Sequence, residues 1–337
     1  MKLSMQAIRC TLNQLIFTAV IVITPLCGST APQIGGYLFS GVSCNPAEKE
    51  SQFEIKFARV NLKGNVNETI RYKLMIDLAR MNTLVKNISD SNSIITRYKP
   101  TPILLDAQLD YSPRLDYTLS AGRMKIPVSA SNLQNPFELE FFQRPLIRKF
   151  IPDTRGTGVL SRLEPFQQKP FKLHMGLFNS PNAYDDESHL DGVLYTNYNP
   201  GNMKFSMSFL QGFIDTVQNQ ITDLAVSVKF DHIHIESEYM IQKLQQHPEA
   251  LTRDGWFLNF VRPYAFQNLQ GVELRAAIRM EQTYTRHGPQ QERLIIGLTV
   301  IFDSSHNNWL RLNYESSKNQ DPHSTEESIA VMWMVRL

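Results

Sequence analysis

The stretch TPILLDAQLDYSPRLDYTLSAGRMKIP, residues 101–127, decides the fold class. Apolar side chains recur at every second position from Ile103 to Tyr111 and again from Tyr117 to Ala121, with polar residues between them. Successive side chains of a strand point to opposite faces of a sheet, so this alternation predicts two strands. The tripeptide Ser112–Arg114 between them predicts a tight turn, and the stretch is therefore expected to form a β-hairpin.

The hairpin leads into a long segment without clean periodicity, Val128–Arg155. A loop of this length inside a compact fold is usually functional. Four cations are concentrated near its end, with Asp153 as the only acid among them: Arg144, Arg148, Lys149 and Arg155. Guanidinium groups present forked donors that match phosphate oxygens, so these side chains are candidates for binding oxyanions.

The order of these elements resembles the phosphate-selective porin O and P family. The resemblance rests on the strand end LDAQLDYSP, the ending Gly122-x-x-Lys125-x-Pro127, the sequence FFQRP around Arg144, and the re-entry Gly156-x-Gly158. It implies an outer-membrane barrel whose third long extracellular loop folds into the lumen and narrows it. It also implies a homotrimer and a pore for small anions, phosphate or related oxyanions among them.

The rest of the chain is a succession of alternating segments, which predicts an all-β fold of about sixteen strands. Besides the hairpin, the segments are Gln33–Ser43, Gln52–Lys63, Ile70–Ala79, Gly156–Glu164, Phe171–Asn179, Gly192–Asn199, Met203–Phe213, Leu224–Phe230, Ile233–Gln242, Gly255–Tyr264, Gly271–Tyr284, Glu292–Phe302, Trp309–Ser316 and Ser328–Leu337.

Short and long connections alternate between these segments. The short ones are 64–68, 112–114, 199–202, 231–232 and 303–308, and the long polar ones are 81–100, 128–155, 180–191, 243–254 and 318–327. A transmembrane antiparallel β-barrel has tight turns on one side of the membrane and long loops on the other. An even number of strands closes the sheet and leaves no edge in lipid. A large periplasmic β-sandwich or lectin is the alternative fold.

The first residues predict a secretory signal peptide over 1–31, which leaves residues 32–337 as the barrel domain. Lys2 and Arg9 precede the apolar run Leu15–Leu26, and small residues follow it. Without the signal, Cys44 is the one remaining cysteine, so no internal disulfide is expected. Removal of Lys2 and Arg9 leaves 32 basic against 32 acidic side chains, a balance that gives no support to nucleic-acid binding.

The strand alternation also predicts which side chains face a water-filled lumen. Trp256, Trp309 and Trp333 are expected near the membrane interfaces. The expected pore-lining cations are Arg59, Lys63, Arg71, Lys73, Lys125, Arg275, Arg279 and Arg311, with Lys172, His174, Lys204 and Lys229 on the same face. The expected inward acids are Asp77, Asp106, Asp110, Asp116, Glu236, Glu238, Glu273, Glu281 and Glu315. Because the lumen is mixed in charge, most of these residues are expected to pair across it, and selectivity is expected to come from the basic loop.

Enzymatic motifs are absent from the sequence. No Gly-x-Ser-x-Gly, His-Glu-x-x-His or phosphate-cradling glycine loop occurs, and no Ser–His pair suggests an outer-membrane phospholipase. The histidines of Asp231-His232-Ile233-His234 fit a turn and a lumen position better than a metal site. We therefore expect no enzyme, metal or cofactor, but an anion porin in the outer membrane of a Gram-negative cell, in contact with lipid and lipopolysaccharide. A non-conducting barrel that serves as an adhesin or structural anchor is the alternative.

Overall fold

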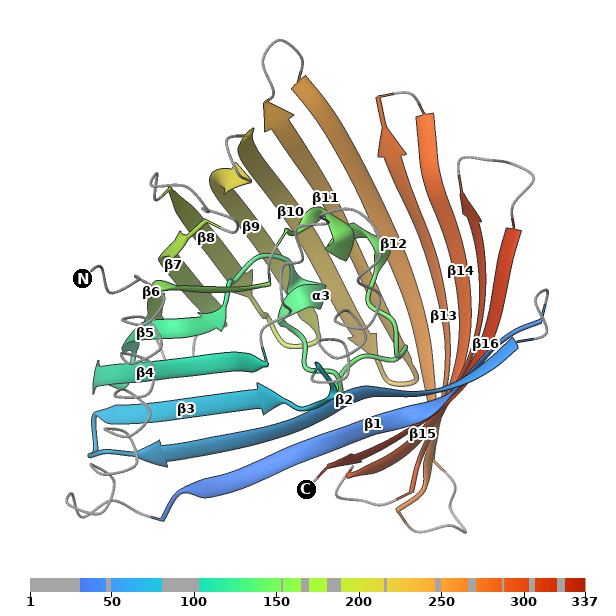
Figure 1. The fold of residues 1–337 in the computed structure, drawn as a ribbon, viewed down its shortest axis with the longest axis horizontal. Coiled ribbons are helices and arrows are strands. Elements are labelled where there is room, and N and C mark those ends of the chain that lie inside the picture. The colour runs from blue at the N-terminus through green and yellow to red at the C-terminus, as the bar shows by residue number, and fades with distance from the viewer. Residues whose placement is uncertain are drawn as a thin grey trace, which may run out of the picture.

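The chain forms a closed antiparallel barrel of sixteen strands in the computed structural model (Figure 1). The structure describes residues 31–46, 50–80, 103–152, 154–164, 170–180, 189–214, 217–245, 250–265, 271–286, 288–302, 307–319 and 325–336. Each strand pairs with its neighbours in sequence, and β1 closes the barrel against β16. The predicted fold class and strand number are thus confirmed. The predicted signal peptide, except for Ala31, and the predicted connection 81–100 lie outside the described residues.

The strands have these bounds: β1 Gln33–Asn45, β2 Glu50–Asn65, β3 Ile70–Asp77, β4 Leu104–Arg114, β5 Tyr117–Lys125, β6 Arg155–Leu163, β7 Phe171–Asn179, β8 Leu190–Tyr198, β9 Met203–Ile214, β10 Val217–Phe230, β11 Ile233–Gln245, β12 Ala250–Ala265, β13 Glu273–Thr285, β14 Gly288–Ile301, β15 Asn308–Asn319 and β16 Thr325–Arg336. Two short helices lie between β5 and β6, α3 (Ala130–Leu133) and the 3₁₀ helix η1 (Leu146–Phe150). No helix of the described part is long and apolar enough to cross a membrane.

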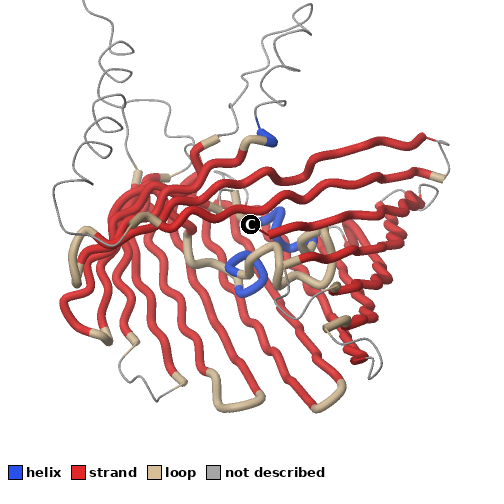
Figure 2. Tube along the Cα trace, turned by 90° about the horizontal axis from the view of Figure 1, so that it is seen from below, coloured by secondary structure: helices blue, strands red, loops and turns tan. Residues whose placement is uncertain are grey.

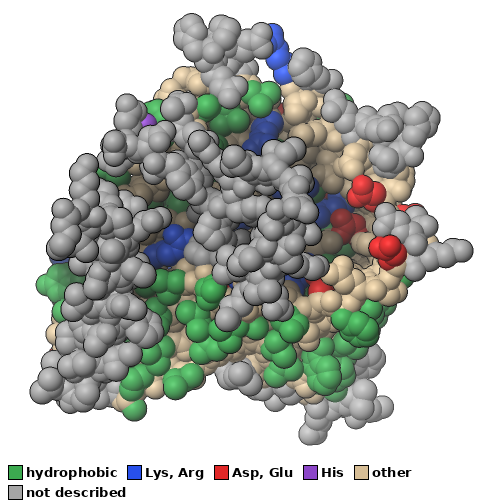
Figure 3. Space-filling view, viewed as in Figure 1, with side chains coloured by type: hydrophobic (Ala, Val, Ile, Leu, Met, Phe, Trp, Pro, Cys, Tyr) green, Lys and Arg blue, Asp and Glu red, His purple; other side chains and the backbone are tan. Residues whose placement is uncertain are grey.

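Along the strands, side chains alternate between the outer and the inner face of the barrel wall. On β13, Met280 is 38% exposed on the outside, whereas its neighbours Arg279 and Glu281 are 1% and 3% exposed inside. Hydrophobic side chains accordingly gather on the outer wall, and charged ones are visible toward the hollow (Figure 3). Apolar-out and polar-in is the arrangement that suits a barrel surrounded by lipid.

Several boundaries differ from the predicted ones. The turn after β4 lies at Leu115–Asp116, rather than at Ser112–Arg114. The strands β10 and β12 begin at Val217 and Ala250. The connections before them therefore shorten to 215–216 and 246–249, and the connection after β15 shortens to 320–324. Polar residues at the ends of these strands still pair with the neighbouring strands. The loop boundaries predicted from polarity alone were therefore wrong.

The segment between β5 and β6, residues 126–154, is called here the inner loop. It lies inside the ring of strands, with α3 and η1 near the middle of the barrel (Figure 2). Its backbone and side chains bond to residues of β9, β11, β13, β14 and β15, on the far side from the strands that carry it. The inner loop therefore crosses the lumen rather than covering one rim.

The inner face of the barrel is not uniformly polar, contrary to the alternating pattern. One buried apolar cluster joins Ile126, Val128, Ile147 and Phe150 of the inner loop to wall residues of β5–β12. A second joins Phe142 to Trp309, Met332 and Met334 with other side chains of β1 and β14–β16. Apolar burial of this kind contributes to the attachment between loop and wall.

Two individual residues also depart from their predicted side. Trp309 is 5% exposed and packs edge-on against Phe137 of the inner loop, so it is not an interfacial tryptophan. Leu105, expected on the outer face, is 1% exposed. A register shift between β3 and β4 pairs Met75 with Asp106 and Ile76 with Leu104, which leaves Leu105 as the extra residue of a bulge.

Candidate functional site

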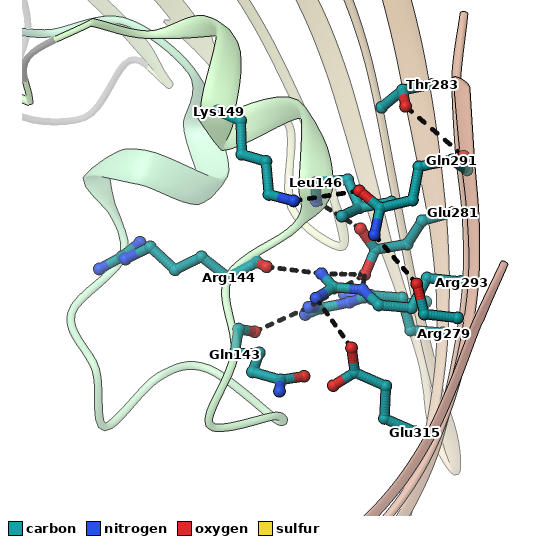
Figure 4. A network of polar contacts seen from close by, with 12 residues as sticks. Gln143, Arg144, Leu146, Lys149, Arg279, Glu281, Thr283, Gln291, Arg293 and Glu315 are labelled. Carbon is teal, nitrogen blue, oxygen red and sulfur yellow. Dashed lines mark hydrogen bonds and ion pairs between the residues drawn. The ribbon is translucent and has the colours of Figure 1, made fainter. Parts of the chain in front are cut away.

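Arginines of β13 and β14 hold the middle of the inner loop through its backbone (Figure 4). Arg293 donates to the carbonyl oxygen of Arg144 at 2.8 Å and to Glu281 at 2.9 Å. Arg279 donates to the carbonyl oxygen of Gln143 at 2.9 Å, and Glu281 accepts the backbone N–H of Leu146. Charge-assisted hydrogen bonds to a backbone are directional and strong. Arg293, Arg279 and Glu281 therefore fix the position of the loop.

The beginning of the FFQRP region is held by two further wall arginines. Arg311 donates to the carbonyl oxygens of Pro136 and Phe137 at 3.3 and 3.2 Å. Arg275 contacts the loop carboxylate of Glu140 at 3.3 Å. Burial raises the pKa of Glu140, and the nearby Arg275 and Arg311 oppose that shift. The predicted pore-lining residues Arg279 and Arg311 are therefore inward, but each is bonded to the loop.

The start of the inner loop is attached to the opposite wall, at β9 and β11. The backbone N–H of Ser129 donates to Ser208 at 3.1 Å, and that of Ser131 donates to Glu238 at 3.0 Å. Gln134 reaches Glu236 at 3.1 Å. Ser129 has a φ of 70°, which a residue other than glycine rarely adopts and which surrounding contacts must maintain.

The four loop cations predicted to form a constriction do not form one free cluster. Arg144 donates to the carbonyl oxygens of Ser131, Asn132 and Gln134, and Arg148 to that of Ile151. Arg155 bonds to the wall carboxylate Asp106 at 2.7 Å, and Lys149 reaches Gln291 on β14 at 3.0 Å.

Arg144 nevertheless lies in a strongly positive region. Burial, together with the neighbouring cations Arg148, Arg59 and Arg155, lowers the pKa of Arg144 to about 10. The structure thus brings three of the four predicted loop cations within electrostatic reach of one another, and adds Arg59 from the wall, while Lys149 is exposed at a separate place.

A cavity of about 630 Å³ lies between the inner loop and β1–β6. Its lining includes Gln33 at the start of β1 and Arg336 at the end of β16. The cavity therefore faces the rim of the barrel at which β1 begins and β16 ends. We call it the basic cavity. Its charged lining is seven cations against the two acids Asp106 and Glu138: Arg59, Lys63, Lys73, Lys125, Arg155, Arg275 and Arg336.

The cations of the basic cavity are crowded on neighbouring strands. Lys63 and Lys73 stand directly opposite each other on β2 and β3, a like-charge pair that destabilises a sheet. Lys73 is compensated by Asp106 at 2.6 Å, which also receives Arg155. Lys125 donates to the carbonyl oxygens of residues 132–134 at 3.2–3.3 Å. Positive charge therefore exceeds negative charge along this side of the lumen.

A second cavity, of about 550 Å³, lies on the other side of the inner loop against β9–β13. We call it the acid-rich cavity, because five glutamates line it with Lys204, Lys229, Arg275 and His234: Glu138, Glu140, Glu236, Glu238 and Glu273. His234 lies 3.3 Å from Glu236 and bonds Ser227. In the described residues no group of three or more His, Cys, Asp or Glu side chains is arranged to hold a metal ion.

The remaining predicted pore residues lie nearer the rims. Arg71 bonds to Ser112 at 3.3 Å, and Lys172 pairs with Glu164 at 3.1 Å, both in exposed positions. Arg293, Arg162 and Arg336 were not among the predicted residues. Arg293 precedes the alternating apolar residues Leu294 and Ile296 in the predicted segment Glu292–Phe302, so the same alternation could have identified it as inward. The bonds of Arg293 to the loop could not have been read in this way.

Comparison with known proteins gives one family and many solved structures. The family described as phosphate-selective porin O and P matches residues 44–255. An anion-selective porin from Comamonas acidovorans is 12% identical, with a TM-score of 0.65 over 92% of this chain and 100% of that chain. OmpT of Vibrio cholerae with loop L8 deleted is 13% identical, with a TM-score of 0.65 over 92% of this chain and 99% of that one.

The similarity extends to general porin structures. The OmpF of Salmonella typhi, in complex with daunomycin, is 8% identical, with a TM-score of 0.61 over 91% of this chain and 97% of that chain. No curated protein matches the sequence. At these identities the solved structures show a common fold, and the family match covers most of the chain.

Proposed function

Since the chain belongs to the phosphate-selective porin O and P family, we propose that small anions, phosphate or related oxyanions, diffuse passively through this barrel past the inner loop. An outer-membrane location follows from the family, and the closed barrel suits a channel rather than an enzyme. The solute class and the route are the proposal.

The observation that carries the proposal is the basic cavity. Seven cations and two acids line it, although the formal charges of the whole chain nearly cancel. A cleft lined by one sign of charge between low-dielectric walls raises the local concentration of the opposite ion. Anion preference here depends on where the charges are, not on their total.

In this mechanism the loop cations have a different role from the predicted binding of oxyanions. Arg144 and Arg148 bond to loop carbonyls and keep the loop folded, while their charge adds to the potential beside the basic cavity. Lys63 and Arg336 are the exposed cations of the lining. An anion that meets a few separated donors is bound weakly enough to leave again, which conduction requires.

The test is the reversal potential of purified protein in a planar bilayer under a salt gradient. We expect anion selectivity in the wild type and a lower anion-to-cation permeability ratio in the double variant Lys63→Gln, Arg336→Gln. A charge about 7 Å from the ion contributes about 0.6 kcal/mol in a water-like dielectric. Because it acts on anions and cations with opposite sign, its removal should change the permeability ratio about sevenfold.

The matched control replaces two lysines of the acid-rich cavity, Lys204→Gln with Lys229→Gln. The two double variants remove the same charge, so a larger effect at the basic cavity assigns the anion route to it. A cation-selective wild type, or equal effects of both variants, contradicts the proposal. A barrel that inserts and does not conduct supports the adhesin or anchor function instead.

A trimer is part of the proposal and has a structural basis in the height of the wall. The strands β3–β8 have 8–11 residues, whereas β9–β16 have 12–16. A tilted strand needs about 9–11 residues to span a membrane, so β3, with 8, falls short. We call β3–β8 the low wall.

The low wall also carries a charge on its outer face. Arg123 on β5 is in register with Ala107 and Thr157, on the side away from the lumen. Its guanidinium donates to the carbonyl oxygen of Leu104 at 3.2 Å. An arginine facing lipid costs up to about 2–4 kcal/mol, depending on its depth in the bilayer. Contact with other copies of the chain would shield both features. Export by the signal peptide 1–31, a Gram-negative host, and contact with lipopolysaccharide complete the proposal.

A further inference from the structure

Two carboxyl groups occupy one buried place on the lumen wall beside the start of the inner loop. Asp223 on β10 and Glu238 on β11 are 0% and 1% exposed. The register pairs Asp223 with Met240 and Ala225 with Glu238, so the two carboxyls are diagonal neighbours on the inner face. Their side chains are within hydrogen-bonding distance of each other.

Each carboxyl has one oxygen with a conventional donor. Asp223 Oδ2 accepts from the hydroxyl of Ser208 at 3.2 Å, and Glu238 Oε2 accepts the backbone N–H of Ser131 at 3.0 Å. The other two oxygens, Asp223 Oδ1 and Glu238 Oε1, are buried and have no partner among the described residues. Ionised carboxylates can only accept, so one added proton turns either oxygen into a donor for the other.

The surroundings do not neutralise a second negative charge. The cross-strand neighbours of the two residues are Ser208, Met240, Ala225 and Phe257. Tyr195 of β8, opposite Ser208, is a neutral phenol, and Ser129 and Ser131 face the pair from the inner loop.

The nearest other titratable groups lie further along β11. They are Glu236 and His234, which lie 3.3 Å apart, and Glu236 also bonds Asn259 and Gln134. The guanidinium of Arg144 bonds the carbonyl oxygen of Ser131, and no lysine or arginine of the described residues bonds either carboxyl. Two carboxylates that share a buried site without a cation do not both ionise.

We propose that Asp223 and Glu238 share one proton at neutral pH, and that this proton positions the inner loop. Glu238 holds Ser131, and Ser208, bonded to Asp223, holds Ser129, so both attachments at the start of the loop depend on the pair. Loss of the proton leaves two adjacent negative charges, which separate and release these attachments. The effect on permeation rests on the proposed function, whereas the shared proton does not.

Infrared spectroscopy of the full-length barrel tests the proton directly. We expect a protonated carboxyl stretch at neutral pH that disappears both in Asp223→Asn and in Glu238→Gln. Asp110→Asn is the control, because Asp110 is held by Arg162 at 3.0 Å and is expected to leave the band unchanged. A band absent from the wild type, or one that persists in both variants, overturns the proposal.

Conductance as a function of pH tests the positioning role. In the wild type, current fluctuations are expected to increase as alkaline pH removes the shared proton. Asp223→Asn supplies a permanent amide donor to Glu238, so its fluctuations are expected to stay low over the same range. Identical pH profiles overturn the positioning role. A barrel that never conducts contradicts the proposed function, and the infrared result still decides whether the proton is shared.

Discussion

The guanidinium of Arg293 joins the barrel wall to the inner loop through the carbonyl oxygen of Arg144, 2.8 Å away. The same guanidinium binds Glu281 at 2.9 Å, and Glu281 accepts the N–H of Leu146. Arg293 and Glu281, paired with each other on the wall, thus hold two points of the loop that lie on either side of Pro145. These contacts attach the loop to β13 and β14 (Figure 4).

Replacing Arg293 with methionine should loosen the loop while keeping an unbranched side chain of similar length. Breaking a buried ion pair by removing one partner costs about 3–5 kcal/mol, because the remaining charge stays buried. We expect a lower free energy of unfolding in denaturant, and larger, noisier single-channel currents.

Arg114→Met is the matched control for that experiment. Its guanidinium pairs with Asp116 at 3.0 Å on an exposed turn, where an ion pair contributes about 0–1 kcal/mol. Equal effects of the two substitutions on channel noise would show that Arg293 does not tether the loop.

The carboxylate of Asp106 should limit anion selectivity. It lies in the basic cavity and binds both Lys73, at 2.6 Å, and Arg155, at 2.7 Å. Asp106→Asn removes one negative charge and keeps an oxygen that can accept a hydrogen bond. We expect the anion-to-cation permeability ratio to rise about sevenfold by the Coulomb argument used above, with a loss of stability because two cations lose their partner. Reversal potential and denaturant unfolding measure the two effects, and an unchanged or lower ratio would contradict the expectation.

The barrel could be predicted from the sequence because its determinants are local. Alternation along one strand decides which side chain faces in, and Arg59, Lys73 and Arg279 are all inward as expected. The bulge at Leu105 was missed, since it arises from pairing with β3 and leaves no mark in the sequence of β4.

The site was less predictable because it depends on contacts between distant segments. The sequence shows Arg144 as a cation, but its hydrogen bonds go to carbonyls of residues 131–134, which the path of the loop brings to it. Backbone acceptors carry no side-chain signal, so the tethering roles of Arg279 and Arg311 were equally hidden. The charge balance at the site could therefore be determined only from the structure.

The inner-loop carboxyl Glu140 should make stability depend on pH. Burial raises its pKa above the ordinary value of 4.5. A carboxyl with a higher pKa in the folded state binds more protons there than in the unfolded chain, so the free energy of unfolding falls as pH rises from 4.5 through the raised pKa.

Glu140→Gln should remove this dependence. The free energy of unfolding of the wild type, relative to the variant, is expected to decrease over that range of pH in denaturant titrations. Glu138→Gln, an exposed glutamate of the same loop, should follow the wild type. A difference that grows with rising pH would contradict the burial argument.

Subunits should meet at the low wall, β3–β8. Ala121 of β5 is exposed there, in register with Leu109 and Val159 on the outer face. In a Cys44→Ser background, Ala121→Cys should form dimeric bands with a short membrane-permeant bis-maleimide, because copies of one outward position converge where the low walls surround a three-fold axis. Leu298→Cys, outward on β14 and 37% exposed, lies outside the low wall; it is the control and should stay monomeric. Crosslinking at Leu298 alone would place the interface at β14 instead, and crosslinking at neither position in lipid would argue for a monomer.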